Sequence, residues 1–132
     1  MRITPDTNLL VRAIVADDLP QARSAQDLLA RAELVALTLP TLCELVWVLA
    51  RGYRIGSLEI AGVVRRLIRS ETAVVNRPAA DAGLAMLELG GDFADGVIAY
   101  EGAWLGSEEF VSFDKKAVAL AINSGFRARL PD

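Results

Sequence analysis

Short apolar runs alternate along the chain with longer stretches in which apolar residues recur at helical spacing, and this alternation restricts the fold more than any other feature. The run LVAL at 34–37 is continuous and apolar, as expected of a strand buried on both faces of a parallel sheet. The pattern predicts an α/β fold with a mainly parallel sheet. Strands are predicted at 2–5, 34–37, 72–75, 109–113 and 126–130, and helices at 8–15, 21–32, 40–51, 78–89, 92–104 and 114–123, with a further helix capped by Ser57.

The length of the chain and the absence of a linker segment predict one domain, residues 1–132. The chain has no internal repeat, no low-complexity tract and no linker rich in proline or glycine. Its hydrophobic share of 53% exceeds the usual value for soluble domains, so we expect a second copy of the chain to cover some apolar surface. Val46, Trp47 and Tyr53 are the candidates for this homodimer surface.

No stretch of the sequence has the length and apolar character of a membrane span. The most apolar run, LCELVWVLA, carries Glu44 in its middle, and the first residues show no basic-then-apolar signal segment. We therefore expect a cytoplasmic protein that does not associate with membranes.

Histidine is absent, and cysteine occurs once, as Cys43. These absences exclude a histidine general base, Ser–His and Cys–His nucleophile pairs, an internal disulfide and a thiolate metal cluster. Catalysis would depend on carboxylates, hydroxyls, lysine or arginine, with a hard cation held by oxygen ligands. The net charge of −3 argues against nucleic-acid binding by the chain as a whole, but divalent ions would invert the field at a cluster of acids.

Acidic residues follow the ends of predicted strands, where ligands bind in open parallel sheets. Asp6 directly follows the first strand, and Asp114 directly follows the strand at 109–113. Asp95 lies in the first turn of the helix before that strand, and Glu44 lies one turn into the helix after LVAL. These acids, from distant parts of the chain, are expected to converge at one edge of the sheet.

Helix capping is the competing interpretation for several aspartates. Asp6, Asp92 and Asp114 each precede a predicted helix, and aspartate is among the preferred N-cap residues. Glu44 is harder to explain in this way, because its sequence neighbours are apolar and an unpaired buried carboxylate is costly. A bound cation would compensate that cost; a solvated position at an edge is the alternative.

Ordered motifs in this chain resemble those of the PIN domain family. They are DTN at 6–8, TLCELVWVL at 41–49, GGDFADGVIAY at 90–100 and FVSFDKKA at 110–117. Within that family the chain is most similar to the VapC-type toxins of bacterial and archaeal toxin–antitoxin pairs, and the resemblance covers residues 1–130. It implies a three-layer α/β/α, PIN-like fold in which helices flank a central, mainly parallel sheet.

The resemblance also implies a site. Asp6, Glu44 and Asp95 match the family's central acids, and Asp114 matches a fourth that is often present. These catalytic residues would hold one or two Mg²⁺ or Mn²⁺ ions. Asn8 and Ser112 match the residues that orient and support the acids, and Asp92 stays a cap because the second Asp of DFAD is the family's site residue.

The implied activity is endoribonuclease cleavage: hydrolysis of RNA phosphodiester bonds by the toxin of a type II, VapBC-like pair. The implied partners are an RNA substrate, a small DNA-binding antitoxin and a second copy of the chain. The alternatives are a housekeeping PIN nuclease of RNA processing and a non-catalytic PIN-like module that binds RNA or protein.

Basic residues near the acids are candidates for holding phosphates. Arg51 and Arg54 follow the helix that carries Glu44, and Lys115 and Lys116 follow Asp114. A solvated helix face is the alternative, and it is the favoured interpretation for the arginines at 65, 66 and 69.

Pro5 departs from the family pattern, because proline lacks the backbone donor that a central strand uses. It either ends the first strand early and shapes the turn before Asp6, or displaces this first acid.

Two other enzyme classes place an aspartate after the first strand. A haloacid-dehalogenase-type phosphatase needs a second acid two residues later, where this chain has Asn8. A response-regulator receiver needs an acidic pair after the first strand and a phosphoacceptor aspartate after the third, and the chain has neither in place.

Overall fold

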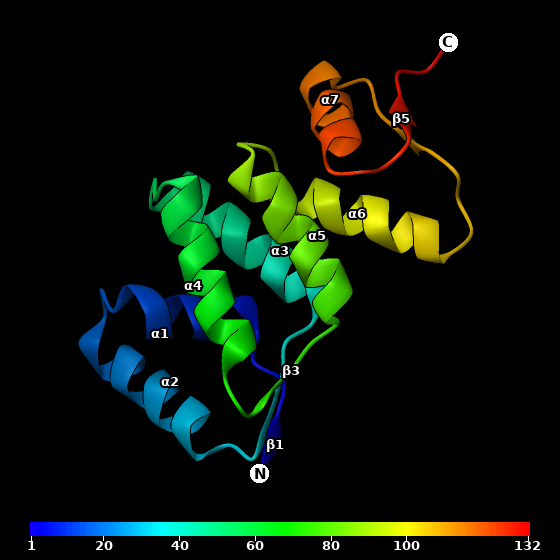
Figure 1. Cartoon of the computed structure of the whole chain (residues 1–132). Coiled ribbons are helices and arrows are strands. Elements are labelled where there is room, and N and C mark those ends of the chain that lie inside the picture. The colour runs from blue at the N-terminus through cyan, green and yellow to red at the C-terminus, as the bar shows by residue number, and fades with distance from the viewer. The chain divides into compact units, whose positions relative to one another are not determined.

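The structure is a computed structural model that describes every residue from 1 to 132. It divides into two compact units, Met1–Asn76 and Arg77–Asp132, which Figure 1 colours from blue to green and from green to red. Each unit has helices and a parallel strand pairing of its own and is described by itself. The single domain that the sequence suggests stays a prediction.

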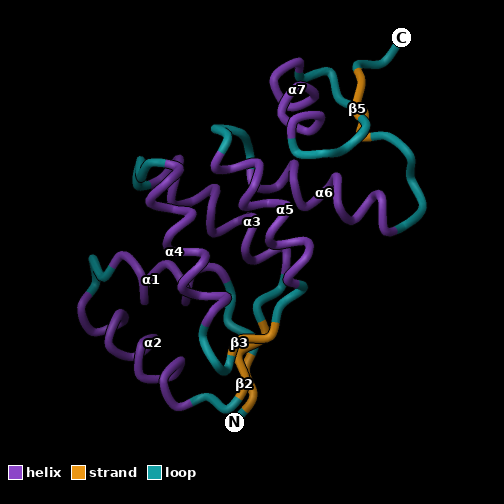
Figure 2. Tube along the Cα trace, viewed as in Figure 1, coloured by secondary structure: helices purple, strands orange, loops and turns teal.

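The first unit contains a three-stranded parallel sheet with β2 (Leu34–Ala36) in its centre. β1 (Arg2–Ile3) and β3 (Ala73–Val74) flank it, and the register places Ile3 and Ala73 opposite Val35. Figure 2 shows these strands as the orange bundle near the N-terminus. The predicted strands are confirmed here but are shorter than their apolar runs.

The first strand ends two residues before Pro5, which is itself buried. Proline cannot donate to a ladder, so pairing with β2 stops and the chain turns directly into α1 (Thr7–Val15). Of the two roles considered for Pro5, the structure therefore supports an early end to the strand.

The remaining helices of the first unit pack around this sheet. They are α2 (Leu19–Arg31), α3 (Leu39–Trp47), the π-helical turn η1 (Val48–Gly52) and α4 (Ser57–Arg69). Gly56, and not Ser57, is the N-cap of α4, and it makes no side-chain capping bond, which corrects the prediction for Ser57. The core consists of fully buried aliphatic side chains, among them Leu10, Leu42, Leu45, Leu49, Ile60 and Val64.

The second unit comprises α5 (Arg77–Glu88), α6 (Phe93–Trp104), β4 (Phe110–Val111), α7 (Lys115–Asn123) and β5 (Ala128–Arg129). β4 and β5 pair in parallel, with Phe110 opposite Ala128. Helices α5 and α6 approach closely because glycines face the contact: a Cβ on Gly83 would lie 2.6 Å from the Phe93 ring. The predominantly helical chain with a three-stranded parallel sheet confirms the α/β class.

The surface candidates for a dimer differ from one another in the structure. Val46 is buried at 4% exposure, so its prediction as a surface residue is wrong. Tyr53 is half-buried and donates a hydrogen bond to Asp17 Oδ2 at 3.2 Å, whereas Trp47 is 60% exposed. Of these three candidates, only Trp47 presents a large exposed apolar side chain.

None of the helices combines the length and the apolar character that a membrane span requires.

Candidate functional site

Asp6 and Glu44 line the same hollow at the carboxyl end of the three-stranded sheet. The hollow has a volume of about 310 Å³ and is lined by Asp6, Thr7, Asn8, Pro40, Thr41 and Glu44. Asp6 follows β1, and Glu44 lies in the second turn of α3, whose N-terminus follows β2. Parallel pairing places the ends of β1 and β2 at one edge, so the first unit brings these two predicted acids together.

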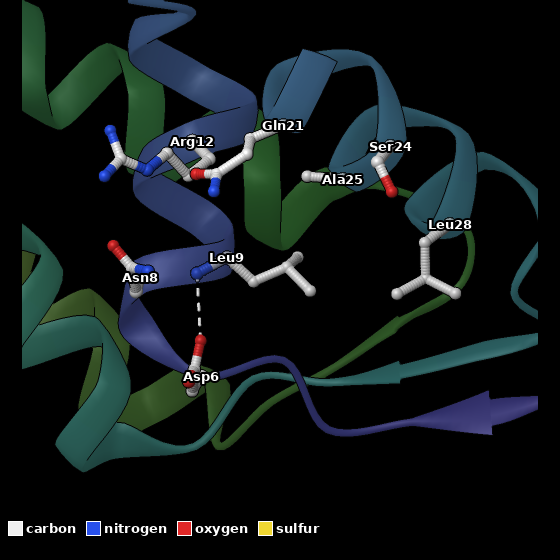
Figure 3. A pocket seen from close by; sticks show the side chains of 8 residues that line it. All are labelled: Asp6, Asn8, Leu9, Arg12, Gln21, Ser24, Ala25 and Leu28. Atoms are coloured by element: carbon white, nitrogen blue, oxygen red, sulfur yellow. Dashed lines mark hydrogen bonds between the residues drawn. The ribbon is translucent and has the colours of Figure 1, made fainter. Parts of the chain in front are cut away.

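The Asp6 carboxylate caps α1 and still has an oxygen free. Its Oδ1 accepts a hydrogen bond from the Leu9 backbone N–H at 2.9 Å, drawn as the dashed line in Figure 3. Oδ2 has no hydrogen-bond partner, and Asn8 lies exposed on the next turn of chain. Capping and metal binding are therefore compatible at Asp6, because they use different oxygens of one carboxylate.

Glu44 is exposed, which corrects the prediction of a carboxylate enclosed by apolar neighbours. The neighbours that are buried, Leu42, Leu45 and Val46, point away from the exposed face of α3 that carries Glu44. The Glu44 carboxylate makes no hydrogen bond or ion pair within its unit. The argument from the cost of a buried charge thus fails, and the case for Glu44 now depends on its place in the hollow beside Asp6.

Asp114 occupies a comparable position in the second unit, between β4 and α7. Its Oδ1 accepts hydrogen bonds from the backbone N–H groups of Lys116 at 2.9 Å and Ala117 at 3.1 Å. Ser112 Oγ accepts one from the Asp114 N–H at 3.0 Å, which holds the turn that presents the carboxylate. As at Asp6, Oδ2 is left without a partner.

Asp92 and Asp95 play different parts at the start of α6. Asp92 Oδ1 accepts a hydrogen bond from the Ala94 N–H at 3.1 Å, so the predicted cap is confirmed. Asp95 is half-buried, and its carboxylate has no hydrogen-bond partner. Partial burial, together with the negative charges of Asp92 and Asp114, raises the pKa of Asp95 above its ordinary value.

The acids fit a hard divalent cation in chemistry, although no group of three or more carboxylates or cysteines is placed to hold one ion. The available ligands are carboxylate oxygens, which suit Mg²⁺ and Mn²⁺. A cation beside Asp95 would offset the repulsion that raises its pKa. The structure brings together Asp6 with Glu44, and Asp95 with Asp114; their convergence on one site stays a prediction.

The predicted phosphate-binding residues are all exposed. Arg51 and Arg54 lie in and after η1, and Lys115 and Lys116 open α7; none of them has an ion-pair partner. Sequence reasoning missed Phe113, which is 87% exposed between Ser112 and Asp114. Phe113 fell inside the strand predicted at 109–113, whereas β4 ends at Val111; the signal was that Ser112, Asp114 and Lys115 around it are polar or charged.

The order of these elements, with acids at strand ends and helix starts, defines an α/β protein with a parallel sheet and an acidic site at its carboxyl edge. The family profile described as the PIN domain matches residues 3–123, and the chain belongs to the PIN domain family. This is a family of nucleases that usually use divalent metal ions. No curated protein and no solved structure matches the chain.

Proposed function

We propose that this protein is an Mg²⁺- or Mn²⁺-dependent endoribonuclease of the VapC type, the toxin of a type II toxin–antitoxin pair. The observation that carries the nuclease proposal is the pair Asp6 and Glu44, which come from different elements and line one open hollow with carboxylate oxygens to spare. In the proposed site these acids bind the metal with Asp95 and Asp114, and Asn8 orients the Asp6 side of the cluster.

In the proposed hydrolysis of a phosphodiester bond, the metal and the fold have different roles. The metal supplies neutralisation of charge on the phosphate and activation of water. The fold supplies rigid placement: Asp6 and Asp114 are fixed by capping bonds at helix N-termini, where the helix dipole favours negative charge. The openness of the hollow leaves room for a phosphate between the acids and the solvent.

Two exposed features of the second unit support RNA as the substrate. Lys115 and Lys116 carry unpaired positive charge beside Asp114, in a chain whose net charge is −3. The free Phe113 ring next to them is suited to stack on an unpaired base.

The test is cleavage of single-stranded RNA by the purified protein with Mg²⁺, with Mn²⁺ and with chelator, beside Asp6→Asn and Glu44→Gln. Asparagine caps helices about as well as aspartate, so Asp6→Asn removes a metal ligand and keeps the cap. We expect each variant to lose about 100-fold or more in rate and chelator to abolish cleavage. Cleavage that survives chelation or both substitutions contradicts the proposal.

Asp92→Asn is the matched control. It makes the same replacement of a carboxylate by an amide at another exposed capping aspartate. Asp92 is not among the predicted metal ligands. Cleavage by this variant should stay within about twofold of the parent, by analogy with the small effect of isosteric cap exchange. An equal loss in Asp92→Asn would assign the effect to folding.

The toxin assignment has a separate readout. Induced expression of the chain should arrest growth, co-expression of the small DNA-binding protein encoded beside it should relieve the arrest, and Asp6→Asn should not arrest growth. Cleavage in vitro without arrest would indicate an RNA-processing nuclease.

The proposed homodimer is tested by sedimentation of the purified chain.

A further inference from the structure

A second hollow lies between α1 and α2, directly beside Asp6 (Figure 3). Its volume is about 240 Å³. Asp6 and Asn8 line both this hollow and the one shared with Glu44, so the two hollows meet at these residues. Whatever occupies the second hollow is therefore next to the proposed site of cleavage.

The hollow between α1 and α2 combines an apolar floor with free polar groups. Leu9 of α1 and Ala25 and Leu28 of α2 supply the apolar part, and Figure 3 shows Leu9 reaching toward α2. The side-chain amide of Gln21 and the hydroxyl of Ser24 are exposed and make no hydrogen bond within the protein. A flat ring with hydrogen-bonding edges matches this arrangement, because its face contacts aliphatic groups while its edge pairs with an amide or hydroxyl.

Arg12 is the one cationic residue that lines this hollow. Its Nη1 donates a single hydrogen bond to Asp17 Oδ1 at 3.3 Å, and its Nε is buried without a partner. The guanidinium thus has donor capacity that the protein does not use, on the same helical face as Asn8. A ligand that carries negative charge beside its ring would suit this side chain.

We propose that the hollow between α1 and α2 is a nucleotide subsite that holds the base adjacent to the cleaved phosphate, and that Gln21 and Ser24 read the edge of that base. The inference rests on the proposed nuclease function and adds to it a determinant of sequence preference. The small volume and the free amide and hydroxyl favour a single base over a protein helix as the occupant.

The test measures base preference at the positions that flank the cut. A pool of short single-stranded RNAs of random sequence is cleaved by the wild-type protein with Mn²⁺, and the new ends are sequenced. Gln21→Leu keeps the approximate volume and removes the amide, and Ser24→Ala removes the hydroxyl. Each should flatten the preference at one flanking position by roughly tenfold, the usual size of discrimination by side-chain hydrogen bonds to a base edge.

Filling the hollow gives a second readout. Ser24→Trp should raise KM for RNA more than it lowers kcat, because the obstruction excludes one base and leaves the acids in place. Ala30→Trp is the matched control, since Ala30 is exposed on the same helix and does not line the hollow. Thermal unfolding of each variant verifies that it folds.

Equilibrium binding separates failure of this inference from failure of the nuclease proposal. A fluorescein-labelled single-stranded RNA is titrated with each variant in chelator, where cleavage is absent. If wild-type protein does not cleave RNA with either metal but binds it more tightly than Gln21→Leu and Ser24→Trp, the nuclease proposal fails and the hollow stands as a base-binding site. If base preference, KM and binding are the same in all variants, the subsite is overturned and a non-nucleotide occupant is indicated.

Discussion

Ser112 Oγ accepts a hydrogen bond from the backbone N–H of Asp114 at 3.0 Å, and this bond closes the turn between β4 and α7. Ser112 holds the backbone from which the Asp114 carboxylate projects. Ser112 thus supports the site by fixing the backbone turn at Asp114.

Ser112→Ala should lower cleavage about tenfold, in the range that supporting residues around metal ligands commonly show. The cause is loss of the acceptor that fixes the Asp114 turn. Ser112→Thr retains the hydroxyl and should restore the rate. A serine that merely fills space would give the opposite order, with Ala tolerated and Thr harmful.

Asp95→Asn should abolish cleavage and stabilise the metal-free protein at neutral pH. Burial and the charges of Asp92 and Asp114 raise the pKa of Asp95 in the folded state, so the fold binds this proton more readily than the unfolded chain does. The stabilisation that comes from protonated Asp95 is complete at a pH below about 3.9, the pKa of an aspartate in the unfolded chain. It is lost as the pH rises through the raised pKa of the folded state. The carboxylate therefore opposes folding at about pH 7.

Thermal unfolding in chelator checks this sign. The Tm of Asp95→Asn should exceed that of the wild type at about pH 7. This difference in Tm should vanish near about pH 3, where the Asp95 carboxyl is protonated in both the folded and the unfolded state. Added Mg²⁺ should raise Tm more for wild type than for the variant. A difference that is independent of pH would assign the effect to packing.

Gly96→Ala should destabilise the protein by about 1–3 kcal/mol, the usual cost of overpacking. A Cβ at this position of α6 would lie 2.8 Å from the Gly83 Cα and would collide with the Ala82 carbonyl oxygen of α5. Both obstacles are backbone atoms, so neither can rotate away. Urea unfolding measures the loss.

Gly102→Ala is the control within the same helix. Its added Cβ would meet only Ser107 Oγ at 3.6 Å, an ordinary contact. Alanine is the better helix former, so this change should stabilise by up to about 1 kcal/mol. Equal effects at positions 96 and 102 would contradict the close packing of α5 on α6.

Ala16→Gly should stabilise the first unit by up to about 1 kcal/mol. Ala16 ends α1 with φ of 57°, a left-handed conformation that strains a residue with a Cβ and leaves glycine unstrained. Ala13→Gly, within the same helix, should instead destabilise by about 0.5–1 kcal/mol. Denaturant midpoints of the two variants should therefore move in opposite directions.

The sequence predicted the order of helices and strands because periodicity and turn residues are local. Helix caps are local in the same way, because an aspartate directly before a helical stretch predicts a cap. The structure confirms this cap at Asp6, Asp92 and Asp114. Strand lengths were overestimated, since an apolar run extends beyond the few residues that pair; at β1, Pro5 sets the limit.

Burial was harder to predict, as Glu44 and Val46 show. Residues adjacent in a helix project about 100° apart, so apolar sequence neighbours say little about the surroundings of the residue between them. Counting positions around α3 and η1 places Leu42, Leu45, Val46 and Leu49 on the buried side and leaves Glu44 and Trp47 exposed. The hollow between α1 and α2 arises from the packing of two helices, and no single segment carries a signal for it.

The caps at Asp6 and Asp114 also link the proposed chemistry to the integrity of the helix ends. Each carboxylate holds its first turn with one oxygen and offers the other to a ligand. If that turn frays, the carboxylate loses its anchoring bonds and its position at the same moment. Local melting of a few residues at the start of α1 or α7 would thus inactivate the protein well below its global unfolding temperature, and a bound ion would protect those turns first.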